Sequence, residues 1–255
     1  MSGYCCRHTH ILITPRMLVT LTIMGIAGLL LTSIGTTFAE KNGATLIGRV
    51  VFKGVVAPDN VVDVKENRKF CGQTMSIQTI RLQEGGHGLD QAIVSLGDIT
   101  TSPARTPEIR NLVNKHCNFV ERINAARVGD KLMVKNLDPV LHNAHGKFGK
   151  RTILNVAQVP GGRAFRKKLK YTGQLDIQCD KHEFMRAHVM VFPHPYFSVT
   201  DNQGHFHINS VPAGKHRITV WHETLGQVEK TIDIPAHGTV TVDFEFRSLT
   251  RGTRP

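Results

Sequence analysis

After its first 39 residues the sequence lacks any long segment with the apolar spacing of an amphipathic helix. It holds instead short β-branched and apolar segments, such as 44–54, 91–96 and 187–192, with turn-forming residues between them. Short strands separated by turn residues are typical of β-sandwiches. The sequence therefore predicts an all-β fold, and 255 residues with 40% hydrophobic content can form two domains.

Cysteine is scarce, and the number of cysteines after residue 40 is odd. Cys71, Cys117 and Cys179 are the three in this part of the chain. In an exported protein an odd count leaves one thiol unpaired. We expect a disulfide between Cys71 and Cys117 and a free Cys179, with two further free or metal-binding thiols as the alternative. Covalent haem attachment is not expected, because Cys179 and His182 lack the second cysteine that such a motif requires.

Acidic residues are also few. The 20 Asp and Glu residues stand against 32 Lys and Arg residues, which gives a formal net charge of +12. A basic chain of this kind favours an acidic protein partner or an anionic surface. No nucleic-acid-binding motif accompanies the charge, so we expect no nucleic acid partner. The sequence also has no legible Ser–His–Asp triad or carboxylate pair, and we expect a protein that is not an enzyme.

One long apolar run is present, at residues 17–34, with Arg7 and Arg16 before it. Thr37–Phe38–Ala39 offers a small-residue cleavage site, so residues 1–39 are predicted to be a signal peptide. An uncleaved N-terminal anchor is the alternative, and only then would the protein contact a membrane. In both cases the predicted location is the periplasm or another extracytoplasmic space.

Residues 174–185 carry the strongest functional signal. Leu175, Ile177 and Cys179 alternate with polar residues, which predicts a strand with these three side chains on its buried face. His182 and Met185 follow Cys179 closely. Cysteine sulfur, histidine nitrogen and a weakly bound methionine are the ligands of blue copper sites, which need one further histidine.

His142, which we expect inside a continuing turn within residues 136–145, is our candidate for that further ligand. We predict one type 1 copper ion bound by His142, Cys179, His182 and Met185. Each of these residues taken alone has a purely structural explanation, such as a buried cysteine or a methionine that fills core space. The prediction therefore rests on their combination.

These motifs resemble those of the cupredoxins. The resemblance covers about residues 122–192 and rests on the Cys-x-x-His-x-x-Met pattern, on the strand at residues 173–179 and on the Gly-Asp turn and strand at residues 129–136. The short gap between the histidine and the methionine is similar to that of amicyanin-type domains, but Glu183 stands where those domains have proline. The resemblance implies a Greek-key β-sandwich, which we place at residues 86–193.

The resemblance also implies how the site works. Asn143 would tie the His142 loop to the Cys179 loop. The ring edge of His182 would be the exposed exit for electrons, with Phe184 in the apolar patch around it. We further expect three cations that follow the His142 loop to border this patch, namely Lys147, Lys150 and Arg151.

A second resemblance covers about residues 195–247. The pattern Thr-Asp-x-x-Gly-x-Phe-x-Ile at residues 200–208 is similar to that of the carboxypeptidase regulatory-like, transthyretin-like β-sandwich. We predict this sandwich at residues 194–255 and accessory strands at residues 40–85. Its histidines, such as His205 and His207, are expected to be surface residues, with a second metal site as the alternative.

The predicted function is electron transfer between redox partners, with an acidic cytochrome or a dehydrogenase as the expected kind of partner. Two alternatives remain. One is copper storage or delivery through the same four ligands, and the other is a subunit of a copper-dependent enzyme, which would need a second metal site.

Overall fold

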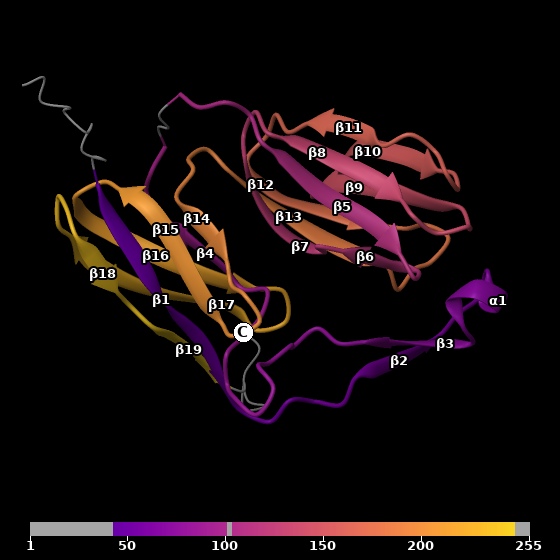
Figure 1. Cartoon of the computed structure of the whole chain (residues 1–255), viewed down its shortest axis with the longest axis horizontal. Coiled ribbons are helices and arrows are strands. Elements are labelled where there is room, and N and C mark those ends of the chain that lie inside the picture. The colour runs from indigo at the N-terminus through magenta and orange to yellow at the C-terminus, as the bar shows by residue number, and fades with distance from the viewer. Residues whose placement is uncertain (1–42, 101–103, 248–255) are drawn as a thin grey trace, which may run out of the picture. The chain divides into compact units, whose positions relative to one another are not determined.

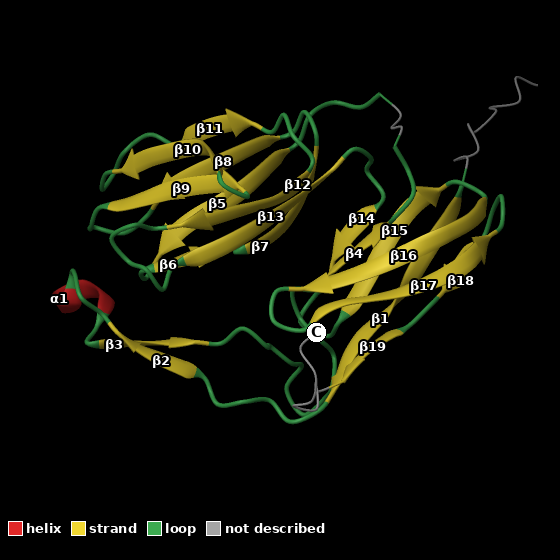
Figure 2. Cartoon of the chain, turned by 180° about the vertical axis from the view of Figure 1, so that it is seen from behind, coloured by secondary structure: helices red, strands yellow, loops and turns green. Residues whose placement is uncertain are grey.

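The computed structural model describes residues 43–100 and 104–247 of the chain and is drawn in Figures 1 and 2. In these residues it contains nineteen strands and one short helix, which confirms the predicted all-β fold. Over the described ranges no helix has the length and apolar character needed to span a bilayer. The predicted signal peptide, residues 1–39, lies outside the described residues.

The central sandwich, residues 109–192, consists of two sheets that contribute to one apolar core. One sheet has the strand order β10-β9-β12-β13-β7, and the other has the order β11-β8-β5-β6. Alternate residues along these strands are buried, among them Leu132, Val134, Leu175 and Ile177. The strands are β5 (Ile109–Lys115), β6 (Asn118–Val120), β7 (Ile123–Arg127), β8 (Lys131–Asn136), β9 (His142–Phe148), β10 (Arg151–Gln158), β11 (Phe165–Lys168), β12 (Gly173–Gln178) and β13 (Arg186–Phe192).

The terminal sandwich combines segments from both sides of the central sandwich in the sequence. One sheet has the order β15-β1-β18, with β19 also paired to β1, and the other has the order β14-β4-β16-β17. Their buried side chains form a second core that includes Phe52, Leu96, Phe206 and Phe244. The strands are β1 (Ala44–Lys53), β4 (Ile93–Leu96), β14 (Phe197–Val199), β15 (His205–Val211), β16 (Gly214–His222), β17 (Gly226–Ile234), β18 (Thr239–Thr241) and β19 (Phe244–Arg247).

The strand pairing corrects two assignments made from the sequence. β4, expected to open the copper-binding sandwich, pairs instead with β14 and β16. β1, expected to be an accessory strand, pairs antiparallel with β15 and parallel with β18 and β19. Apolar alternation identifies a strand and its buried face but says nothing of its partner, so both assignments were wrong.

Residues 54–80, between β1 and β4, form a separate hairpin that we call the arm. Its elements are β2 (Asn60–Asp63), α1 (Arg68–Cys71) and β3 (Thr74–Ile77). The two strands pair only with each other, and α1 lies at the tip of the hairpin (Figure 1). A disulfide joins Cys71 to Cys117, which lies in the turn between β5 and β6. Because the two cysteines are 46 residues apart, this bond restricts the unfolded chain and stabilises the fold by roughly 4 kcal/mol.

The close contact of β1 with the segment before β19 gives a first testable prediction. A Cβ atom on Gly48 would lie 1.8 Å from the carbonyl oxygen of Val242. We expect Gly48→Ala to lower the free energy of unfolding by about 1–3 kcal/mol, because the backbone must move apart. Denaturant unfolding measures this. Gly238→Ala, at a position with no neighbouring atom within 4 Å, shows the cost of backbone strain alone, because Gly238 has a φ of +96°. An unchanged free energy of unfolding in Gly48→Ala would contradict the close packing.

Candidate metal site

Three predicted ligand atoms converge in the central sandwich. His142 begins β9 and Cys179 directly follows β12, and these strands are antiparallel neighbours. The Nδ1 atoms of His142 and His182 are 3.1 Å apart. The sulfur of Cys179 lies 4.0 Å from Nδ1 of His142 and 3.6 Å from Nδ1 of His182. All three side chains are buried, so they form a compact set of one sulfur and two nitrogen atoms.

Asp138 determines which nitrogen of His142 faces this set. Its Oδ2 atom lies 2.9 Å from Nε2 of His142, so Nε2 carries the ring proton and donates a hydrogen bond to the carboxylate. Nδ1 then has a free lone pair directed at His182 and Cys179. Burial lowers the pKa of His142, and the hydrogen bond and charge of Asp138 offset this only in part. The ring is therefore neutral at pH 7, which is the form that binds metals.

His182 lies in the short loop that follows Cys179. Burial lowers the pKa of His182, and the neighbouring His142 lowers it further. Two backbone hydrogen bonds close the loop, from Cys179 N to Met185 O at 3.1 Å and from Met185 N to His182 O at 2.8 Å. These bonds return the chain to the sandwich, and Met185 is buried in the same core cluster as Cys179.

Asn143 joins the two loops, as the sequence suggested. Its Oδ1 accepts a 2.7 Å hydrogen bond from Asp180 N, and its Nδ2 donates one of 2.8 Å to the carboxylate of Asp180. The backbone N–H of Asn143 also points at Cys179 Sγ, 3.5 Å away. Desolvation raises the pKa of Asp180, but hydrogen bonds from Gln178, His145 and Asn143 outweigh it and lower that pKa to about 2.

The donor set fits copper. One cysteine sulfur and two imidazole nitrogens in one buried cluster are soft and intermediate donor atoms, which bind copper better than they bind a hard cation such as Mg²⁺. A second potential group in the described residues, Cys117 with Asp138 and His142, cannot offer a thiolate because Cys117 is in the disulfide. The first group is therefore the candidate metal site.

The arm covers His182, and this corrects the expected electron exit. His182 is only 1% exposed, and its Nε2 atom lies 3.7 Å from the sulfur of Cys71. We expected the ring edge of His182 to reach solvent, and that expectation was wrong. No local sequence signal indicates that a disulfide would bring a segment more than a hundred residues away onto this ring.

Apolar packing and charge hold the arm over this loop. Val64 and the disulfide form a small cluster to which Met75, Val140 and Phe184 add their side chains. Lys65 pairs with Glu183 at 3.2 Å, and Glu66 pairs with Lys181 at 2.6 Å. These crossed ion pairs lie on the two sequence neighbours of His182. Phe184, expected in an exposed patch, instead packs edge-on against His182 with ring centroids 5.8 Å apart.

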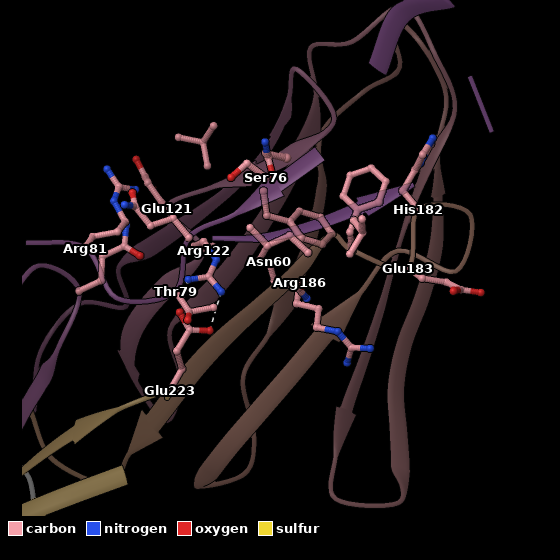
Figure 3. Close-up of a pocket in the computed structure, with 18 of the residues that line it drawn as sticks. Asn60, Ser76, Thr79, Arg81, Glu121, Arg122, His182, Glu183, Arg186 and Glu223 are labelled. Carbon is pink, nitrogen blue, oxygen red and sulfur yellow. Dashed lines mark hydrogen bonds and ion pairs between the residues drawn. The ribbon is translucent and has the colours of Figure 1, made fainter. Parts of the chain in front are cut away.

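A cavity of about 740 Å³ separates the rest of the arm from the central sandwich. Asn60 and Ser76 of the arm line it, and Arg122 and Arg186 line it from the central sandwich (Figure 3). Arg122 is ion-paired with Glu223 inside this cavity. The cavity reaches His182 at one end, so the covered ring lies next to a solvent space of mixed charge.

The expected basic border of the site is also wrong. His142 begins a strand rather than lying within a turn, and β9 carries the chain away from the site. At about 3.3 Å per residue, Lys147 lies roughly 17 Å from His142. Arg151 pairs with Phe148 at the far end of the β9–β10 hairpin, and Lys150 lies in its turn.

Other histidines do not join a metal site in the described residues. His145 points to the opposite face of β9 from His142, where it contacts Asp180 at 3.0 Å. His205 and His207 are exposed on β15. The structure brings neither of them within ligand distance of two further ligand atoms. Sequence reasoning missed Asp138, although an aspartate four residues before a ligand histidine is a usable signal.

Comparisons with known proteins were made at three levels. No family model and no curated protein matches the chain. A copper-containing nitrite reductase from Thermus scotoductus SA-01 matches with 16% identity and a TM-score of 0.30, over 35% of this chain and 23% of the reductase. A purple cupredoxin from Nitrosopumilus maritimus matches with 22% identity and a TM-score of 0.24, over 27% of this chain and 76% of that one. A reduced Cu(I) amicyanin variant matches with 18% identity and a TM-score of 0.30, over 39% and 98%.

The similar structures are thus cupredoxins matched at low identity over part of this chain. This chain spans less than a quarter of the nitrite reductase. The reductase is nevertheless an enzyme, and this finding overturns our expectation that the chain is not one. We therefore make no such exclusion.

The role of Asp138 can be tested with Asp138→Asn. The amide of asparagine can donate to Nε2 of His142, which moves the ring proton to Nδ1 and blocks the metal-facing lone pair. We expect a 10- to 100-fold loss of Cu(II) affinity, on the order seen when partners of ligand histidines are removed. A competitive chelator titration measures this. Asp176→Asn, which removes a surface partner of His188, is the control. Unchanged affinity in Asp138→Asn would show that Asp138 does not orient the ligand.

The cover can be tested on the metal-free protein with the double variant Cys71→Ser, Cys117→Ser. Without the disulfide, only the small apolar cluster around Val64 and the exposed ion pairs, at about 0–1 kcal/mol each, hold the arm, so it should open more often. We expect acylation of the ring of His182 by diethyl pyrocarbonate to speed up by about tenfold or more, the factor that corresponds to 1.4 kcal/mol. Mass spectrometry follows the reaction. The variant Lys65→Ala, Glu66→Ala should have a smaller effect. Equal acylation rates of His182 in the parent and the cysteine variant would contradict a disulfide-held cover.

Proposed function

We propose that the chain binds one copper ion of the type 1 kind through His142, Cys179, His182 and Met185, and that it transfers single electrons. The observation that carries this proposal is the convergence of two histidine Nδ1 atoms and one cysteine sulfur within 4.0 Å. Met185, buried in the same core and tied to His182 through its backbone, is the proposed weak fourth ligand.

Copper in such a site supplies reversible one-electron chemistry, and the protein keeps the ligands in place during the change. Asp138 fixes the ring of His142, and the loop hydrogen bonds fix Cys179 and His182. The N–H of Asn143 directed at Cys179 stabilises negative charge on the sulfur. Because these groups are buried and already positioned, little rearrangement accompanies electron transfer.

The arm favours electron transfer over copper delivery. Delivery requires that a ligand can be released to an acceptor, whereas His182 is enclosed by Cys71 and Phe184. An extracytoplasmic location is part of the proposal, because disulfides persist in oxidising compartments. The specific redox partner is not part of it.

The proposal predicts an intense thiolate-to-copper band in the visible spectrum of the oxidised protein. Cys179→Ser should abolish this band, and His142→Ala should remove it or shift it strongly. His145→Ala is the matched control, since His145 lies three residues from His142 but on the opposite face of β9 and should leave the band unchanged. Visible spectra recorded during a Cu(II) titration measure the band in the parent and in each variant. A colourless parent, or a band that survives in Cys179→Ser, would falsify the proposal.

A further inference from the structure

We propose that α1 at the tip of the arm is the docking surface for an acidic redox protein, with Cys71 as the contact to His182. This inference rests on the proposed function. The exposed side chains involved are called the cap surface and comprise Arg68, Lys69, Phe70, Lys115 and Leu137.

The cap surface adjoins a residue that is in direct contact with a proposed ligand. In the central sandwich the ring of His182 is covered, and Cys71 of α1 is in contact with its outer nitrogen at 3.7 Å. Cys71 is the residue that follows Phe70, which is 38% exposed. A partner that touches Phe70 is therefore one residue away from an atom in contact with His182.

The segments of the cap surface meet at the disulfide. Cys117 lies two residues after Lys115, and its Cα atom is 5.6 Å from that of Cys71. The N–H of Leu137 donates a 2.9 Å hydrogen bond to Asn114 O, which places Leu137 beside Lys115. Leu137 is 53% exposed. Two exposed apolar side chains, Phe70 and Leu137, thus accompany the cations in one region.

Charge identifies the kind of partner. Lys69 and Lys115 are exposed and form no ion pair with any other described residue, and Arg68 donates only to a backbone carbonyl. The other cations beside His182 are already neutralised, because Lys65 and Lys181 pair with Glu183 and Glu66. The cap surface therefore carries uncompensated positive charge together with two exposed apolar side chains. A partner with carboxylates around an apolar contact is its complement.

The other routes to the site have weaker features. The cavity beside His182 has charges of both signs, and its Arg122 is paired with Glu223 (Figure 3). Lys147 and Lys150 lie at the far end of β9.

In the proposed reaction one electron passes from the reduced partner to the bound copper, with no bond made or broken. The partner is oxidised by one electron, and the copper goes from Cu(II) to Cu(I).

The first test uses the metal-free protein, so that its outcome does not depend on copper binding. Hexacyanochromate(III) is a paramagnetic anion that broadens the NMR signals of nearby amides. We expect it to broaden the amide signals of Lys69, Phe70 and Lys115 first. Broadening that is confined to Lys147 and Lys150, or that is uniform over the surface, would overturn the assignment of the cap surface.

The second test uses the copper-loaded protein and a reduced, acidic c-type cytochrome. The variant Lys69→Glu, Lys115→Glu should slow the reaction with the acidic cytochrome by at least about tenfold at low salt, since local charge steers encounter by 10- to 1,000-fold. The difference should shrink as salt rises. The variant Lys147→Glu, Lys150→Glu has the same net charge and should keep the parent rate. Equal rates in both variants, or a loss only in the second, would contradict the proposal, whereas a missing visible band would instead refute the proposed function.

Discussion

The buried carboxylate of Asp138 is the constraint on which the candidate site depends. It accepts hydrogen bonds from the backbone N–H groups of His116 and Cys117, at 2.7 and 2.9 Å, and from Nε2 of His142. One group thus sets the tautomer of a proposed ligand and the conformation of the turn that holds the disulfide. His116 and Cys117 both have positive φ angles, a conformation that these hydrogen bonds help to stabilise. The orientation of His142 and the attachment of the arm are therefore linked through a single side chain.

The local features of the site could be predicted from the sequence because they depend on short spacings. Leu175 and Ile177 are buried in β12, and Cys179 continues on the same face, as two-residue alternation requires. His182 and Met185 are brought back by a loop only a few residues long. The convergence of His142 on Cys179 could be expected only by resemblance, since it depends on the pairing of β9 with β12 across more than thirty residues.

The rest could not be predicted because it depends on contacts between distant segments. β1 completes a sheet with strands near the other end of the chain, and nothing in residues 44–53 identifies these partners. His142 was expected within a turn, but the alternation of His142, Ala144 and Gly146 on one buried face is that of a strand. This one difference moves Lys147 and Lys150 away from the site. A period-two pattern made of His, Ala and Gly is weak because these residues are not strong strand formers.

The arm also gives a physical account of Glu183, the residue that departs from the amicyanin-type pattern. A proline at this position would leave Lys65 without its partner, whereas Glu183 pairs with Lys65 and the neighbouring Lys181 pairs with Glu66. Both residues of the Lys65–Glu183 pair are about three-quarters exposed, so the pair adds little to stability. Its contribution is positional: opposite charges on each side of His182 align α1 with the loop, and the disulfide supplies most of the free energy that keeps it there. Lys65 and Glu66 of the arm are paired with the loop in this alignment. The cations of α1 itself, Arg68 and Lys69, remain available for a partner.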